Sequence, residues 1–168
     1  NPELLRIIKK NIKGVSKLSK DRLLDELRKM MKIDILENLS KDKKSLDLLL
    51  IIFPELKNVK IFSKLKPHLR DILRDNDAIF LISLMIIDEN DNADYFLYKF
   101  NFSKKDEKRI KNIDKFFKEK INSKTFLEEN MNKIFYYYGK ETALDILNYR
   151  MIKLNKLDNS IKKLIKNY

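Results

Sequence analysis

The sequence has no cysteine, one histidine, two glycines and three prolines among its 168 residues. Without cysteine there is no disulfide scaffold and no thiolate chemistry. A single histidine, His68, excludes a histidine–aspartate phosphohydrolase centre, which needs several histidines as metal ligands. Two glycines are too few for a glycine-rich phosphate loop, and sheets joined by tight turns usually contain more glycine and proline. These absences favour an all-α fold and argue against a complete catalytic centre.

Long hydrophobic runs and a signal peptide are also missing. The longest apolar stretch, residues 78–87, spans about ten residues and contains Ser83, so it is too short to cross a bilayer. The first residues, NPELLRIIKK, lack a signal-peptide pattern. We therefore expect a cytoplasmic protein with no membrane partner. Because the chain begins with Asn1, we also expect it to be a piece of a longer protein.

Positive charge is abundant. The formal net charge is +12, and it is concentrated in residues 1–32 (+6), 99–124 (+6) and 150–168 (+5), with net negative segments between them. Such a pattern favours an anionic partner, most often nucleic acid. The alternative is codon bias towards lysine, because 30 of the 37 basic residues are lysine. Solvated helix faces would also explain part of the pattern.

Hydrophobic periodicity predicts an irregular array of roughly nine to eleven helices. Ser19, Asp77 and Ser103 are the expected caps at helix starts, and Gly139 is the expected end of another helix. The expected helices span residues 1–14, 20–31, 33–39, 46–53, 67–74, 78–87, 95–100, 104–120, 123–138, 140–154 and 157–165.

One acidic loop resembles the start of a calcium-binding loop. It reads Asp88-x-Asn90-x-Asn92, but its sixth position is Ala93 instead of glycine and its twelfth is Lys99 instead of glutamate. We therefore interpret it as an acidic surface loop. No metal site is expected in this chain.

Three other features have a functional and a structural interpretation. Asp75-x-Asp77 is a carboxylate pair of the kind that holds magnesium, yet its place between two helices favours helix capping. His68 follows a proline at a helix start, which favours an exposed or capping histidine. Residues 136–138 are three tyrosines of the kind that stack on bases, but their different directions on a helix put one or two of them in the core.

Five segments form an ordered pattern along the chain: NPELLRIIKKNIKGVSKLSKDRLLDEL (residues 1–27), LLLIIFPEL (48–56), DAIFLISLMI (77–86), FNFSKKDEKRI (100–110) and YYYGKETALDIL (136–147). In this order they resemble the helical region that follows the catalytic head in bacterial tRNA nucleotidyltransferases (CCA-adding enzymes) and poly(A) polymerases. Each segment alone is an ordinary capped helix, and the order over nearly the whole chain makes the pattern specific. Asp21-Arg22 stands where Glu-Arg is usual.

The resemblance implies the C-terminal part of the class II nucleotidyltransferase/poly(A) polymerase architecture. Residues 1–56 would end the neck, and residues 57–168 would form the body and tail. The family's head, with its Gly-Ser motif, metal-binding aspartate pair and nucleotide template, has no counterpart in this sequence. The resemblance therefore implies no enzyme activity and no cofactor for this chain alone. Its parent would use magnesium with CTP or ATP, while this part holds the acceptor and T arms of tRNA.

RNA held by its shape is contacted at phosphates, so lysines and arginines on rigid helices are the candidates. The resemblance assigns Arg22 and Glu26 to buttressing the head, although their spacing of four also permits a local ion pair. The candidate RNA-binding residues are Lys104, Lys105, Lys108, Arg109 and Lys111 on the basic helix, and Lys156, Lys162, Lys163 and Lys166 in the tail.

Two other functions stay open. The first is a helical protein-interaction module whose positive charge reflects codon bias only. Such a module would carry an apolar surface groove and show no preference for RNA over other polyanions. A stand-alone enzyme is the least favoured, because the sequence lacks an ordered set of catalytic residues. An exposed apolar neck surface would also allow the chain to form a dimer.

Overall fold

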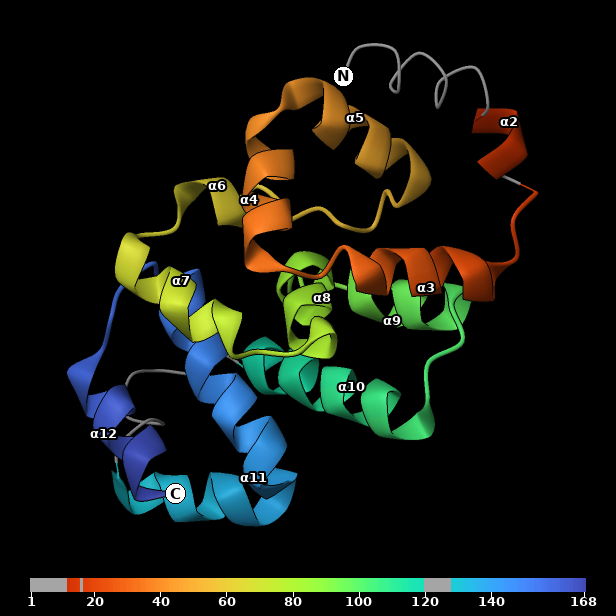
Figure 1. Cartoon of the computed structure of the whole chain (residues 1–168). Coiled ribbons are helices and arrows are strands. Elements are labelled where there is room, and N and C mark those ends of the chain that lie inside the picture. Colours follow the sequence, from red (N-terminus) through yellow and green to blue (C-terminus); the bar gives the residue numbers. More distant parts are fainter. Residues whose placement is uncertain (1–11, 16, 120–127) are drawn as a thin grey trace.

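The computed structural model describes residues 12–15, 17–119 and 128–168. Within these ranges the chain is helical and contains no strand, and the number of helices lies in the expected range (Figure 1). The all-α prediction is confirmed. The predicted helix over residues 1–14 and the predicted helix start at Ser123 fall largely outside the described residues.

In the N-terminal part, the described residues form α2 (Ile12–Val15), α3 (Lys20–Lys29), α4 (Ile33–Lys41) and α5 (Lys43–Ile52). The Ser19 side chain accepts a hydrogen bond from the Arg22 N–H at the start of α3, as predicted. Asp42 caps α5 in the same way, so α5 begins three residues before the apolar run that predicted it.

The middle of the chain contains α6 (Ile61–Lys64), α7 (Pro67–Arg74), α8 (Ala78–Ile86) and α9 (Asn92–Lys99). Helix α8 lies at the centre of the fold (Figure 1), and residues 79–86 are all buried. A helix that is apolar on every side is stable only inside a core. The prediction that this helix is central is confirmed.

The C-terminal part consists of α10 (Lys104–Lys118), α11 (Glu128–Lys153) and α12 (Asn159–Asn167). Helix α10 packs against α8, α9 and α11, and α12 packs against α11. Buried side chains from Leu24 to Leu164 form one hydrophobic cluster, so residues on both sides of position 56 share a core.

Helix α11 is kinked at Gly139, whose φ of 77° and ψ of 163° are not helical. This combination of angles is essentially restricted to glycine. A Cβ atom added there would meet nothing within 4 Å, so the penalty for a side chain comes from the backbone alone.

We therefore expect Gly139→Ala to lower the free energy of unfolding by about 1–3 kcal/mol. Urea denaturation followed by circular dichroism would measure the loss. Gly139→Ser should cost about as much as alanine, because the penalty comes from the backbone angles and the space around a Cβ atom there is open. A loss that grows with side-chain size would contradict this explanation.

Candidate RNA-binding surface

Arg109 joins three helices through a buried network of ion pairs. It lies on α10 and is only 7% exposed. Its guanidinium donates from Nη2 to Asp145 Oδ1 on α11 at 2.9 Å, and Nε donates to the other oxygen of the same carboxylate. Its Nη1 donates to Asp77 Oδ2, beside α8, at 2.6 Å, and lies 3.4 Å from Glu141 Oε1. This two-pronged geometry is the strong form of an arginine–carboxylate contact.

The network shifts the pKa of each member according to its surroundings. Burial raises the pKa of Asp145 above its ordinary value, and the Arg109 hydrogen bonds offset this only in part. Burial also opposes ionisation of Asp77, but hydrogen bonds from Arg109 and the Phe80 N–H outweigh it and lower its pKa. Burial lowers the pKa of Arg109, while its bonds to Asp145 and Asp77 raise it further than burial lowers it. The guanidinium therefore stays charged.

Arg109 does not offer its charge to a ligand in solution, so we remove it from the candidate RNA contacts. The other lysines predicted on α10 are exposed. Lys105 lies 3.2 Å from Glu141, and Lys111 pairs with Glu107. Lys104 and Lys108 have no carboxylate within 4.0 Å among the described residues, which makes them the stronger candidates on this helix.

The four predicted tail lysines are all exposed, and none pairs with a carboxylate in the part of the chain that the structure describes. Asp158 is the carboxylate closest to them in sequence, but it caps α12 by accepting from the Ser160 and Ile161 N–H groups. Burial of Ile161 and Leu164 holds α12 against the core. The tail thus presents several unneutralised positive charges on an anchored helix.

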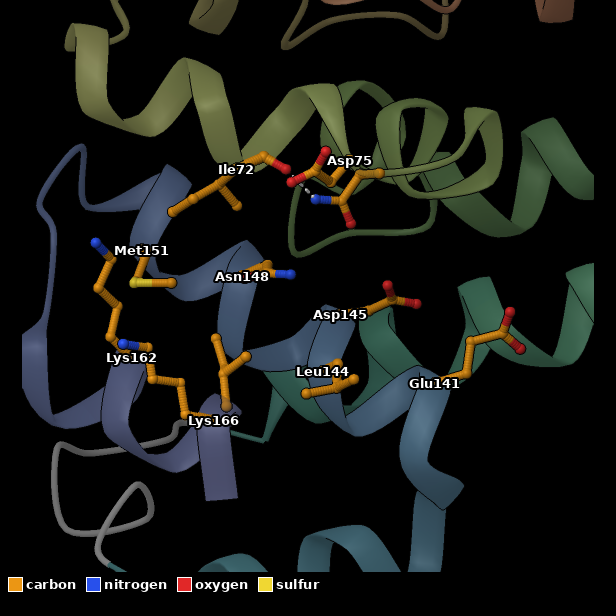
Figure 2. A pocket seen from close by; sticks show the side chains of 11 residues that line it. Ile72, Asp75, Glu141, Leu144, Asp145, Asn148, Met151, Lys162 and Lys166 are labelled. Atoms are coloured by element: carbon orange, nitrogen blue, oxygen red, sulfur yellow. Dashed lines mark hydrogen bonds between the residues drawn. The ribbon is translucent and has the colours of Figure 1, made fainter. Parts of the chain in front are cut away.

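Two tail lysines border a pocket of about 440 Å³ between α7, α11 and α12, which we call the tail pocket. In Figure 2, Lys162 and Lys166 lie on one side, and Asp145 and Glu141 lie on the other, with Asn148 and Leu144 between them. The full lining is Ile72, Asp75, Asn76, Glu141, Leu144, Asp145, Asn148, Met151, Lys162, Ile165 and Lys166.

A second basic cleft, of about 510 Å³, lies beside α6, and the sequence analysis did not identify it. Lys57 and Lys153 line it and pair with Asp88 and Glu89 respectively. The unneutralised lysines there are Lys60 and Lys64. These two lysines were not predicted as anion contacts because residues 33–98 carry a net negative charge. Their spacing of four residues nevertheless indicates that they lie on one face of a helix. The cleft offers further contacts to an anion.

Arg22 and Glu26 are both exposed on α3. Glu26 pairs with Lys29 at 2.7 Å instead of with Arg22, and this hydrogen bond lowers the Glu26 pKa. Glu26 also lines an apolar groove of about 430 Å³, the α3–α5 groove, whose other members include Leu27 and Leu49. Of the two residues predicted to buttress a head, Glu26 therefore lies at an apolar surface, and Arg22 is not part of the groove lining.

The three consecutive tyrosines have different surroundings. Tyr138 packs against the core and makes an edge-on contact with Phe116. Tyr136 and Tyr137 are 85% and 76% exposed. The expectation that one or two of the three belong to the core holds for Tyr138.

No group of three histidine, aspartate or glutamate side chains that could hold a metal occurs among the described residues. Asp77 caps α8 and pairs with Arg109, so helix capping accounts for it. His68 is exposed in the first turn of α7, as expected.

Among the helices that the structure describes, none has the length and apolar character needed to span a bilayer. Comparisons with models of known families, with curated proteins and with solved structures found no match to this chain.

Proposed function

We propose that this chain binds RNA as the C-terminal helical part of a tRNA nucleotidyltransferase of the CCA-adding or poly(A) polymerase type. In this role it holds the acceptor and T arms of tRNA while a head adds nucleotides. The observation that carries the proposal is a set of exposed lysines without a carboxylate partner in the described residues. They are Lys104, Lys108, Lys156, Lys162, Lys163 and Lys166. Point charges on packed helices suit phosphate contacts that do not depend on sequence.

The Arg109 network gives further support, because its members come from three of the segments that resemble the family. Asp77 belongs to the segment DAIFLISLMI, Arg109 to FNFSKKDEKRI and Asp145 to YYYGKETALDIL. Segments that look ordinary one at a time are therefore joined through a single buried contact. This is what a common fold would require of them.

The proposal assigns catalysis to the head and not to this chain. The metal and the CTP or ATP are placed on the head because the resemblance implies it. Arg22, Glu26 and the apolar α3–α5 groove would then face that head. The chain alone should incorporate no nucleotide into tRNA.

Binding to a tRNA minihelix tests the proposal, with fluorescence anisotropy measured over a series of salt concentrations. Neutralising the four tail lysines with glutamine should weaken binding at least about tenfold near 0.1 M salt. It should also lower the slope of log affinity against log salt by about 3, because each phosphate contact contributes about 0.7–0.9. The variant is Lys156→Gln, Lys162→Gln, Lys163→Gln and Lys166→Gln combined.

A matched control removes the same charge from the N-terminal part. The four lysines replaced in this control are exposed and, within the described residues, also lack a carboxylate partner. The control variant should bind the minihelix nearly as well as the original chain. Equal losses in both variants would mean that net charge alone attracts the RNA. The control is Lys20→Gln, Lys32→Gln, Lys43→Gln and Lys44→Gln combined.

The α3–α5 groove favours one alternative, a helical protein-interaction module with no RNA role. Its apolar lining and volume of about 430 Å³ would accept a partner helix or a second copy of the chain. Absence of minihelix binding at low salt, together with a dimer in light scattering, would favour this alternative.

A further inference from the structure

The tail pocket has an apolar floor of the size expected for a small ligand. Ile72, Leu144, Met151 and Ile165 line it, and its volume of about 440 Å³ lies within the usual range for ligand sites. The packing of α12 maintains the pocket, because the Tyr168 ring stacks on Phe135 of α11 at 3.9 Å. The floor can therefore bury a flat apolar surface.

The two sides of the pocket carry opposite charges. Lys162 and Lys166 lie four residues apart on α12, so both side chains reach the same side (Figure 2). Asp75 and Glu141 supply carboxylates elsewhere on the rim, while both oxygens of Asp145 are occupied by Arg109. A ligand with a negative group at one end and hydrogen-bond donors at the other would match this arrangement.

Asn148 lies between these two sides and has an unused side-chain amide. Its carboxamide makes no hydrogen bond with the described residues, although it is half-buried in the pocket lining. Asn76 is different, because its Nδ2 donates to the Ile72 carbonyl at 2.6 Å. Asn148 thus offers a donor and an acceptor above an apolar floor, which is how asparagine recognises the edge of a base.

We propose that the tail pocket receives one unpaired nucleobase of the bound RNA, an inference that rests on the RNA-binding function above. The base lies on the apolar floor with its edge against Asn148, and the flanking phosphates contact Lys162 and Lys166. The carboxylates accept from an exocyclic amino group, which adenine and cytosine carry and uracil lacks. The pocket therefore prefers an amino-bearing base.

RNA hairpins that differ in one unpaired nucleotide test this inference. The position carries adenine, uracil or an abasic sugar, and affinity is measured by anisotropy. The full chain should bind the adenine hairpin about tenfold more tightly than the uracil hairpin, as expected for one or two hydrogen bonds. The abasic hairpin should bind most weakly.

Two variants locate the effect. Asn148→Leu should bring the adenine-to-uracil ratio to about 1 while the salt slope stays unchanged, because the lysines remain. Leu144→Trp, which fills the pocket, should reduce binding of the adenine hairpin to the level of the abasic one. Thermal melting would establish that both variants fold. If Leu144→Trp does not fold, Asn148→Leu alone is enough to test the inference.

The outcomes separate this inference from the function on which it rests. Salt-dependent binding that needs the tail lysines but ignores the base would overturn the inference and leave the proposed function standing. An unchanged ratio in Asn148→Leu would do the same. Absence of any RNA binding would overturn both.

Discussion

Replacing Arg109 with methionine should lower the free energy of unfolding by about 3–5 kcal/mol at neutral pH. The reason is the carboxylate that the guanidinium leaves behind. Asp145 is 4% exposed, and both of its oxygens accept from Arg109. Removing one partner of a buried ion pair leaves an uncompensated charge in the interior, which destabilises a protein by this amount. Urea denaturation at pH 7 would measure the loss.

The loss should shrink as the pH falls. Burial raises the folded-state pKa of Asp145, and removing Arg109 raises it further, so the ionised carboxylate destabilises the variant only above that pKa. The hydrogen bond from Arg109 also helps lower the folded-state pKa of Asp77. This lowered pKa stabilises the original chain at pH values above the unfolded-state pKa of Asp77, and the stabilisation is lost as the pH falls. Both effects make the difference between the two proteins smaller near pH 4 than at pH 7.

Two further proteins complete this test. Lys105→Met removes an exposed cation that pairs with Glu141 in the same region, and should change stability by no more than about 0.5 kcal/mol. Combining Arg109→Met with Asp145→Leu should recover most of the loss, because apolar side chains can replace both partners of a buried pair. A loss that is independent of pH, or that persists in the double variant, would contradict the role given to the buried charge.

The helix caps were predictable because their chemistry is local. Ser19, Asp77 and Ser103 each accept a hydrogen bond from the N–H three residues later, as their positions before apolar stripes predicted. Helix α6 was missed. It has only four residues, too few to show a hydrophobic periodicity in the sequence. Its packing on α4, a contact between segments distant in sequence, stabilises it.

The role of Arg109 was not predictable from its neighbours. Its partners Asp77 and Asp145 lie 32 and 36 residues away, and only folding brings them together. One local signal was present, since position 109 falls on the same helical face as Ile113 and Phe116, which are buried. Exposure of the tail lysines followed from the sequence, but the pocket that Lys162 and Lys166 share with Asn148 did not, because α7, α11 and α12 all contribute to it.

Asn92→Ala should lower the free energy of unfolding by about 2–4 kcal/mol, although this residue belongs to the loop that resembles a calcium site. Asn92 is 6% exposed, and its Nδ2 donates to the Glu55 carbonyl at 2.8 Å and the Ile86 carbonyl at 2.7 Å. The side chain thus joins the segment after α5 to the end of α8. Alanine would leave two buried carbonyls without their donor, and each unsatisfied group costs about 1–3 kcal/mol.

Asn90→Ala is the matched control from the same loop. Asn90 is exposed and bonds only to Asp88 within the turn, so its loss should change stability by no more than about 0.5 kcal/mol. Thermal melting with and without millimolar calcium distinguishes the two interpretations of the loop. If Asn92 acts by joining backbone segments, calcium should leave the midpoint unchanged in all three proteins. A midpoint that rises with calcium in the original chain but not in Asn92→Ala would instead make this loop a calcium site.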